Sequence, residues 1–204
     1  MTLQRTPLHQ LCQDGGGRMV PFAGWEMPVQ FSGLIQEHKA VREHVGMFDI
    51  SHMGVLRLEG PNPKDALQQL VPSDLHRIGP GEACYTVLLN EAGGIRDDLI
   101  VYDCGAIDAE QGALVLVINA ACAEADTAWI RDQMEPAGLT VSDLKAGGVL
   151  LALQGPQAIP LLEELSGESL SDLPRFGHRT LSLKDLAHPV FTGRTGYTGE
   201  DGAE

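Results

Sequence analysis

Residues 84–119 read CYTVLLNEAGGIRDDLIVYDCGAIDAEQGALVLVIN, and the fold class follows largely from this stretch. Three runs rich in apolar residues predict strands over 84–89, 95–103 and 113–119. The segment 90–94 contains two glycines and joins the first two runs as a hairpin with a longer loop. Strands joined by hairpins pair in antiparallel fashion, so the middle of the chain is predicted to form an antiparallel sheet.

Helices are predicted on both sides of this stretch. In 34–45, Leu34, Ile35, His38, Val41, Arg42 and Val45 share one side of a helix, and Gly46 suits a left-handed stop. Asn62-Pro63 reads as an N-cap and first-turn proline for a helix through Leu70. A further helix is predicted over 121–135, with a buried side formed by Ala121, Ala125, Ala128, Trp129 and Ile130.

Shorter elements complete the pattern. Strands are predicted over 54–59, 149–154, 180–183 and 190–195, and Gly155-Pro156 begins a helix through Leu165. Strands outnumber helices, so we predict an α+β fold of mostly antiparallel sheets with flanking helices. Composition shifts near 46–53 and 144–148 predict an inserted module, 51–144, within a first domain made of 1–50 and 145–204.

The charge balance restricts the classes of partner. The 204 residues carry 14 Lys and Arg against 28 Asp and Glu, a formal net charge of −14. Nucleic acids and anionic membranes are bound by clustered cations, so we expect neither as a partner. No run of about 18 apolar residues predicts a membrane span. The first residues lack the apolar core of a secretory signal, which favours a cytoplasmic location.

The cysteines and histidines give no metal signature. Cys12, Cys84, Cys104 and Cys122 are widely spaced, without a CxxC pair, and are interpreted as buried, reduced thiols. The histidines form no HExxH or paired His/Cys spacing, so no metal site is predicted.

Asp97 and Asp98 form an acidic pair within an otherwise apolar strand. Alternation places them on opposite faces, Asp98 with Ile100 and Asp97 with Leu99. At least one carboxylate therefore faces a packed or ligand-lined side, where burial raises its pKa and suits it to acid–base chemistry. The alternative is an aspartate near a turn that accepts local backbone amides, and the residues alone leave both open.

Two other stretches place polar residues close together. Residues 49–53 (DISHM) bring a carboxylate, a hydroxyl and an imidazole together, but without a GxSxG context a structural turn is the favoured interpretation. Residues 195–202 (TGYTGEDG) are a glycine-punctuated loop that lacks a phosphate-loop pattern. Close approach to a flat ligand and a plain turn are equally compatible with this loop.

Several motifs, taken in order, resemble one family. They cover nearly the whole chain: Thr6-Pro7-Leu8, VPFAGWEMP at 20–28, VGMFDISHMG at 45–54, NEAGGI at 90–95 with DDLIV at 97–101, NAA at 119–121, ALQGP at 152–156 and RTGYTGEDG at 194–202. Together they are similar to the T-proteins of the glycine cleavage system, a family of aminomethyltransferases. The resemblance implies the folate-binding fold of that family.

The resemblance also implies the chemistry. Members transfer the one-carbon unit of an aminomethyl group, carried on the dihydrolipoyl arm of lipoylated H-protein, to tetrahydrofolate. Ammonia is released and 5,10-methylenetetrahydrofolate forms. Tetrahydrofolate is thus the expected co-substrate and H-protein the expected partner.

Site residues are carried over position by position. Asp98 matches the family's second aspartate of the DD pair, expected to orient folate and assist proton transfer. Asp97 is interpreted as structural. Folate contacts are expected at Met53, Tyr85, Val117, Asn119, Tyr197 and Glu204. Of these, Glu204 is expected to accept adjacent N–H donors of the pterin edge, and four, Met53, Tyr85, Val117 and Tyr197, are expected to line an apolar hole for the ring.

The chain differs from the family pattern at its end. Members continue beyond the position of Glu204 into the rest of the first domain and a C-terminal barrel-like domain, which we do not find. The expectation is therefore an incomplete first domain with little transferase activity on its own. Alternatives are the folate module of a dimethylglycine or sarcosine oxidase and a non-catalytic folate-binding relative used in iron–sulfur maintenance. The latter group carries KGCYxGQE where this chain has RTGYTGE.

Overall fold

The computed structural model describes residues 2–204, which divide into two compact units. Unit 1 comprises residues up to His52 together with Gly147–Glu204, and unit 2 is Met53–Ala146. The α+β class with mostly antiparallel sheets is confirmed, because every pair of neighbouring strands within the described sheets is antiparallel. The division into 1–50, 51–144 and 145–204 stays a prediction about domains, since compactness alone does not show independent folding.

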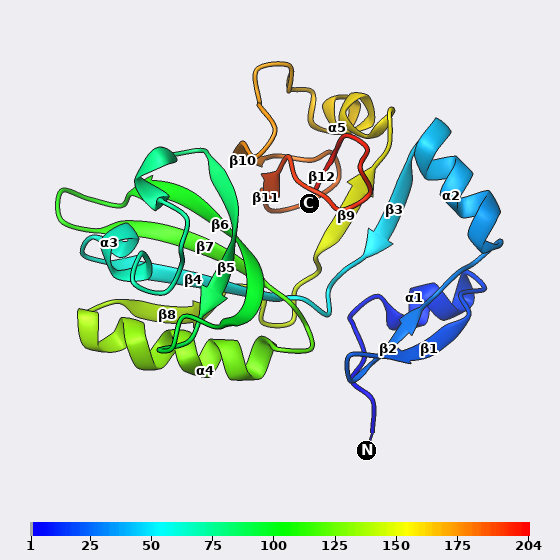
Figure 1. Cartoon of the computed structure of the whole chain (residues 1–204). Helices are drawn as coiled ribbons and strands as arrows, with labels where there is room; N and C mark the ends of the chain where they lie inside the picture. The colour runs from blue at the N-terminus through cyan, green and yellow to red at the C-terminus, as the bar shows by residue number, and fades with distance from the viewer. Residues whose placement is uncertain (1) are drawn as a thin grey trace. The chain divides into compact units, whose positions relative to one another are not determined.

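Unit 2 is built on a five-stranded sheet (Figure 1). Its order is β5-β6-β7-β4-β8, with bounds Ala83–Leu89, Ile95–Ala106, Gly112–Ile118, Gly54–Gly60 and Thr140–Asp143. The predicted hairpin is present: β5 and β6 pair directly, and the Asn90 amide donates to the carbonyl of Gly94 across the turn. β6 continues past its predicted end at residue 103, with a register shift between Asp103 and Gly105.

One face of this sheet carries the main hydrophobic core. Leucines of alternating positions, such as Leu58, Leu114 and Leu116, are fully buried there. They pack with Ile130 and Met134 of α4 (Ala123–Met134), and α3 (Pro63–Leu67) lies against β4 and β7. Short 3-10 turns at Leu75–Arg77 and Glu135–Ala137 complete the unit. The alternation of each strand therefore determines which face is covered by helices.

The described residues of unit 1 form three small sheets and three helices (Figure 1). The three-stranded sheet has the order β12-β9-β3, formed by Gly202–Ala203, Leu151–Gln154 and Gly46–Asp49. Two hairpins pair β1 (Met19–Phe22) with β2 (Trp25–Pro28) and β10 (His178–Leu181) with β11 (Val190–Gly193). The helices are α1 (His9–Asp14), α2 (Leu34–Glu43) and α5 (Ala158–Ser166). A second core gathers α5 with Leu170, Leu173 and Leu181.

Two local predictions in unit 1 are wrong. Gly46 does not end α2 in a left-handed conformation; it is the first residue of β3 and pairs with Gln154. A Cβ there would lie 2.5 Å from Cγ2 of Val41, so glycine permits the close approach of strand and helix. The predicted apolar side of α2 is also largely exposed, with only Val41 buried.

Two helices of unit 2 also differ from prediction. α3 ends at Leu67, and Asn62 adopts a left-handed conformation without a side-chain cap. Ala121 precedes α4, and it and the helix residues Ala125 and Ala128, all predicted to be buried, are exposed. The buried side of α4 is formed by Asp126, Ile130 and Met134. These buried positions recur every four residues, which is the spacing of one helix face.

Among the described residues, no helix is long and apolar enough to cross a membrane.

Candidate functional site

Asp98 lies on the face of the β5-β6-β7-β4-β8 sheet opposite the main core. Strand register aligns Tyr85, Ile100 and Val117 in one row across three strands. Asp98 is two residues before Ile100, so it shares that face. The Tyr85 hydroxyl donates a hydrogen bond to the Asp98 carboxylate, and this raises the pKa of Tyr85. The structure therefore brings together three of the predicted residues, an aspartate, a tyrosine and a valine.

Asn119 holds both aspartates of the pair. It follows β7 directly, and its Nδ2 lies 3.0 Å from Oδ1 of Asp97, 3.2 Å from Oδ1 of Asp98 and 3.1 Å from the Asp98 carbonyl. Its backbone N–H donates to Oδ2 of Asp97 at 3.3 Å. A single amide group thus links carboxylates that alternation places on opposite faces.

Asp97 belongs to a second group of titratable side chains, at the start of α4. Its carboxyl, the Cys122 thiol and the Asp126 carboxyl each have a ligand atom within 4.8 Å of the others. Burial and the contact with Asp97 raise the pKa of Asp126 to about 6. Burial also raises the pKa of the Cys122 thiol, and the negative charge of Asp97 adds to the effect. These three are the described residues whose donor set comes closest to a metal site.

Glu204 and the glycine-punctuated loop belong to unit 1. The Thr195 hydroxyl donates to Oε2 of Glu204 at 2.5 Å, and burial raises the pKa of this carboxyl. Gln154 connects β9 to the loop 195–202 by two hydrogen bonds. Its Nε2 donates to the Thr195 carbonyl at 2.9 Å, and its Oε1 accepts from the Thr198 hydroxyl at 2.9 Å. Glu204 is therefore a desolvated carboxyl next to an ordered loop.

The remaining predicted contacts are placed as follows. Tyr197 is at the tip of that loop, with 67% of its surface exposed. Met53 directly precedes β4, and its carbonyl accepts a hydrogen bond from Nζ of Lys145. Met53, Tyr85, Val117 and Asn119 thus belong to unit 2, whereas Tyr197 and Glu204 belong to unit 1. The predicted apolar hole draws on residues of both units and stays a prediction.

The structural interpretation of residues 49–53 is supported. The Ser51 amide donates to Oδ1 of Asp49 at 2.9 Å, which closes a local turn. The Ser51 hydroxyl donates to the carbonyl of Leu150 and accepts from its amide, at 3.1 and 3.0 Å. The hydroxyl thus joins two chain segments and is not placed as a nucleophile. All four cysteines are unpaired; Cys12 is buried and the others are half-buried.

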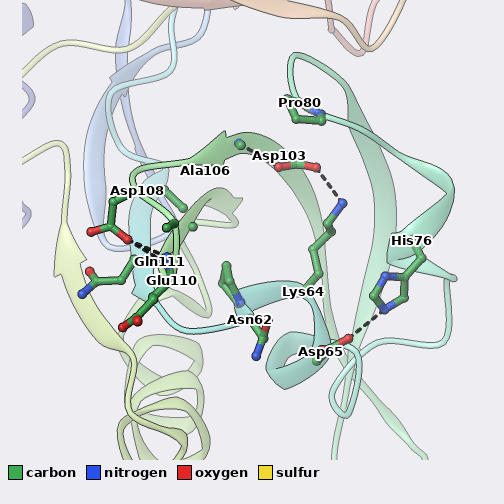
Figure 2. Close-up of a pocket in the computed structure, with 15 residues that line it drawn as sticks. Asn62, Lys64, Asp65, His76, Pro80, Asp103, Ala106, Asp108, Glu110 and Gln111 are labelled. Atoms are coloured by element: carbon green, nitrogen blue, oxygen red, sulfur yellow. Dashed lines mark hydrogen bonds and ion pairs between the residues drawn. The ribbon is translucent and has the colours of Figure 1, made fainter.

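Unit 2 also contains a cavity of about 320 Å³ that none of the predicted site residues lines (Figure 2). Nζ of Lys64 lies 2.7 Å from Oδ2 of Asp103 and 2.9 Å from the carbonyl of Ile78. Asp103 is almost fully buried and also accepts from the Gly105 amide at 2.8 Å. The ion pair therefore stabilises β6 at its register shift, so we assign Lys64 and Asp103 a structural role.

Comparison with known proteins identifies the family. Residues 8–204 match the model of the GCVT N-terminal domain. The chain belongs to this family. It is 97% identical over 204 residues to an aminomethyltransferase of Parasynechococcus marenigrum (strain WH8102), and 70% identical over 206 residues to one of Synechococcus sp. (strain WH7803). Each comparison covers 100% of this chain and 56% of the relative, so the chain spans about half the length of these curated relatives.

A solved structure agrees with this family assignment. The chain is similar to the crystal structure of glycine cleavage system aminomethyltransferase T from Bartonella henselae, with a TM-score of 0.84 and 36% identity. The match covers 99% of this chain and 53% of that one. The resemblance to the T-protein family and its fold is thereby confirmed.

Sequence reasoning missed Asp126 and the full role of Asn119. Asp126 is four residues before Ile130 and eight before Met134, so helical spacing alone placed its side chain on their face. Its burial was not expected because aspartate is rarely buried unless it is paired. Asp97, interpreted as structural, proves to contact both Asn119 and the start of α4.

Proposed function

We propose that this GCVT N-terminal domain chain carries the folate-binding part of a tetrahydrofolate-dependent aminomethyltransferase of the glycine cleavage system. The observation that carries the proposal is 97% identity, over all 204 residues, to a protein named aminomethyltransferase. In the proposed reaction, tetrahydrofolate takes the one-carbon unit from the aminomethyl-dihydrolipoyl arm of H-protein. The products are ammonia, the dihydrolipoyl arm and 5,10-methylenetetrahydrofolate.

Asp98 is the proposed catalytic residue. The Tyr85 hydroxyl and the Asn119 amide both donate to its carboxylate, so its orientation is held from two sides. A carboxylate held in this way can orient a reactive folate nitrogen and accept or return its proton as that nitrogen attacks the methylene carbon. Tyr85 and Val117 offer aromatic and apolar surface on the same sheet face, which is compatible with a flat ring.

The proposed pterin contact of Glu204 fits the chemistry of its surroundings. A pterin edge presents adjacent N–H donors, which a single carboxylate can accept as a pair. Thr195 already donates to Oε2 of Glu204 and so orders the carboxyl group. Met53, Asn119 and Tyr197 complete the proposed set of folate contacts.

The proposal is tested on Asp98 with two variants. Calorimetry with tetrahydrofolate on this chain should show binding to the wild type and to Asp98→Asn. In the longer relative that is 97% identical, the corresponding change should lower kcat for methylenetetrahydrofolate formation by roughly 10²–10⁴-fold, because only proton transfer and orientation are lost. Asp98→Ala should weaken folate binding as well.

The matched control is Asp132→Asn, the same charge change at an exposed position of α4. It should leave both binding and turnover unchanged. Equal turnover in Asp98→Asn and wild type would make Asp98 structural, and absence of tetrahydrofolate binding to the wild-type chain would contradict the proposed folate site.

A further inference from the structure

Asp126 is a buried carboxyl with an unsatisfied oxygen. Its side chain is 2% exposed, and Oδ2 has no hydrogen-bond partner among the residues that the structure describes. An oxygen of the neighbouring Asp97 carboxyl lies within 4.8 Å of an oxygen of Asp126, and the two side chains interact as hydrogen-bond partners. Two carboxylates can form a hydrogen bond only when one of them carries a proton, and an orphaned buried oxygen is costly. The geometry therefore calls for a proton between Asp97 and Asp126.

The charges around the pair lead to the same conclusion. On β6, Nε of Arg96 lies 3.7 Å from Oδ1 of Asp126, and its guanidinium lies over the Trp129 ring, 5.0 Å from the centroid. Cys122, at the start of α4, is the other titratable group facing Asp126, and burial keeps its thiol protonated by raising its pKa. One cation thus faces two carboxyl groups, and a shared proton supplies the missing positive charge.

Asn119 transmits the state of this pair to Asp98. Its side-chain amide has two hydrogens, whereas three oxygens of Asp97 and Asp98 lie 3.0–3.2 Å from Nδ2. Hydrogen bonds to a full negative charge are stronger than those to a neutral or half-charged carboxyl. When Asp97 shares a proton with Asp126, Asp97 competes less for the amide hydrogens of Asn119. These hydrogens then form stronger hydrogen bonds with Asp98.

We propose that Asp126 is a positioning residue: its carboxyl shares one proton with Asp97, and through Asn119 this pair sets the orientation of the Asp98 carboxylate. The role of Asp98 in transfer rests on the proposed function. The shared proton and its effect on Asn119 rest on the contacts of Asp97, Asp126 and Asn119 and do not depend on the proposed function. Ionisation of Asp126 returns full charge to Asp97, draws the Asn119 amide away from Asp98 and loosens its orientation.

A divalent cation is the competing occupant of the cluster. Two carboxylates and a thiolate can ligate zinc, which is why this possibility must be separated experimentally. The Arg96 guanidinium beside Asp126 and the raised pKa of the Cys122 thiol both oppose a further cation. Metal binding is therefore an outcome that the test has to detect and that contradicts the proposal.

The experiment follows Asn119 directly by NMR. The sequence contains Asn62, Asn90 and Asn119, so ¹⁵N-asparagine labelling gives few side-chain amide signals. We expect the Asn119 amide signal of the 204-residue chain to shift between pH 5 and 7.5, with a midpoint at about 6. Asp132→Asn should keep this midpoint, whereas Asp126→Asn should abolish the transition, because its amide donates to Asp97 at every pH.

Four results overturn the proposal: an Asn119 signal that does not respond to pH, a midpoint that persists in Asp126→Asn, an Asp126 carboxyl ¹³C signal in the wild type whose midpoint differs from that of the Asn119 signal, and stoichiometric binding of zinc that Asp126→Asn abolishes. The carboxyl titration needs only the wild-type chain and so remains decisive even where the variant fails to fold.

Calorimetry with tetrahydrofolate on the same samples separates the two proposals. If the wild type binds folate, Asp126→Asn should remove the change in affinity that the wild type shows between pH 5 and 7.5. If the wild type does not bind folate, the proposed function fails, while the Asn119 titration still decides whether the proton is shared.

Discussion

Asp126 shows how one residue can contradict its local pattern. Apolar neighbours at helical spacing place it in the interior, where an ionised carboxylate is costly. The structure offsets this cost with Arg96 on one side and Asp97 on the other. Lys64 and Asp103 solve the same problem by a direct ion pair. Buried charge in unit 2 is therefore paired by residues distant in sequence.

The pH dependence of stability tests this description. Burial raises the pKa of Asp126 from 3.8 to about 6, so the folded chain holds this proton more tightly than the unfolded chain. As the pH rises through this interval the unfolded state ionises first, and stability falls; above about pH 6 the effect is constant. The asparagine of Asp126→Asn cannot ionise. The free energy of unfolding of this variant should therefore rise relative to that of the wild type by up to about 3 kcal/mol across this window.

Urea unfolding at pH 4.5, 5.5, 6.5 and 7.5 measures the difference between the two proteins. The exposed Asp132→Asn on the same helix is the control and should differ from the wild type by a constant amount. A difference between Asp126→Asn and wild type that does not change with pH would show that Asp126 titrates normally.

Among the elements, the β9–α5 junction is tightly constrained. Gly155 has φ +129°, and a Cβ there would lie 2.5 Å from the His44 carbonyl oxygen and 2.7 Å from that of Val41. The Gly155 amide donates to the carbonyl of Asp201, which connects the end of α2, β9 and the glycine-punctuated loop. Only glycine allows these three segments to approach so closely.

Gly155→Ala should therefore destabilise the chain by about 2–4 kcal/mol, the sum of backbone strain and a clash with main-chain atoms that cannot yield. The control is Gly167→Ala, which also has a positive φ, +72°, but open space around the added methyl group. Gly167→Ala should lower the free energy of unfolding by about 1 kcal/mol. Denaturant unfolding compares them, and equal losses would show that strain alone, not the close approach, requires glycine at position 155.

At the scale of the whole molecule, two hydrophobic cores correspond to two compact units. Leu114 belongs to the core of unit 2 and Leu170 to that of unit 1, and both are fully buried. The sequence prediction of an inserted module implies that each core stabilises its own unit. A matched pair of cavity-forming substitutions can test this.

Leu114→Ala and Leu170→Ala each remove the same atoms from a buried site. Each should lower the free energy of unfolding of its own unit by about 2–5 kcal/mol. In native-state hydrogen exchange, Leu114→Ala should lower the protection of β5–β7 amides and leave β9 unchanged. Leu170→Ala should do the reverse. Equal loss of protection in both units by either variant would mean that they unfold as one cooperative domain.

Local sequence signals were sufficient to predict four of the five strands in the described sheet of unit 2, all except β8. The ordered motifs indicated the family, and the role of Asp98 stays a prediction. Strand alternation and hairpin turns are local signals, and a run such as 95–103 carries them within a few residues. The same locality explains the errors. The exposed side of α2, the strand role of Gly46 and the partners of the buried Asp126 depend on neighbours far along the chain.

The connections among the acidic residues, in contrast, are visible only in the folded chain. Asp97 and Asp98 point to opposite faces by alternation, yet Asn119, more than twenty residues later, joins them, and α4 brings Asp126 against Asp97. Sequence spacing gives the face of a side chain but not the partner that it meets there. Partners are set by strand register and helix packing, because contacts between distant segments form only when the chain folds.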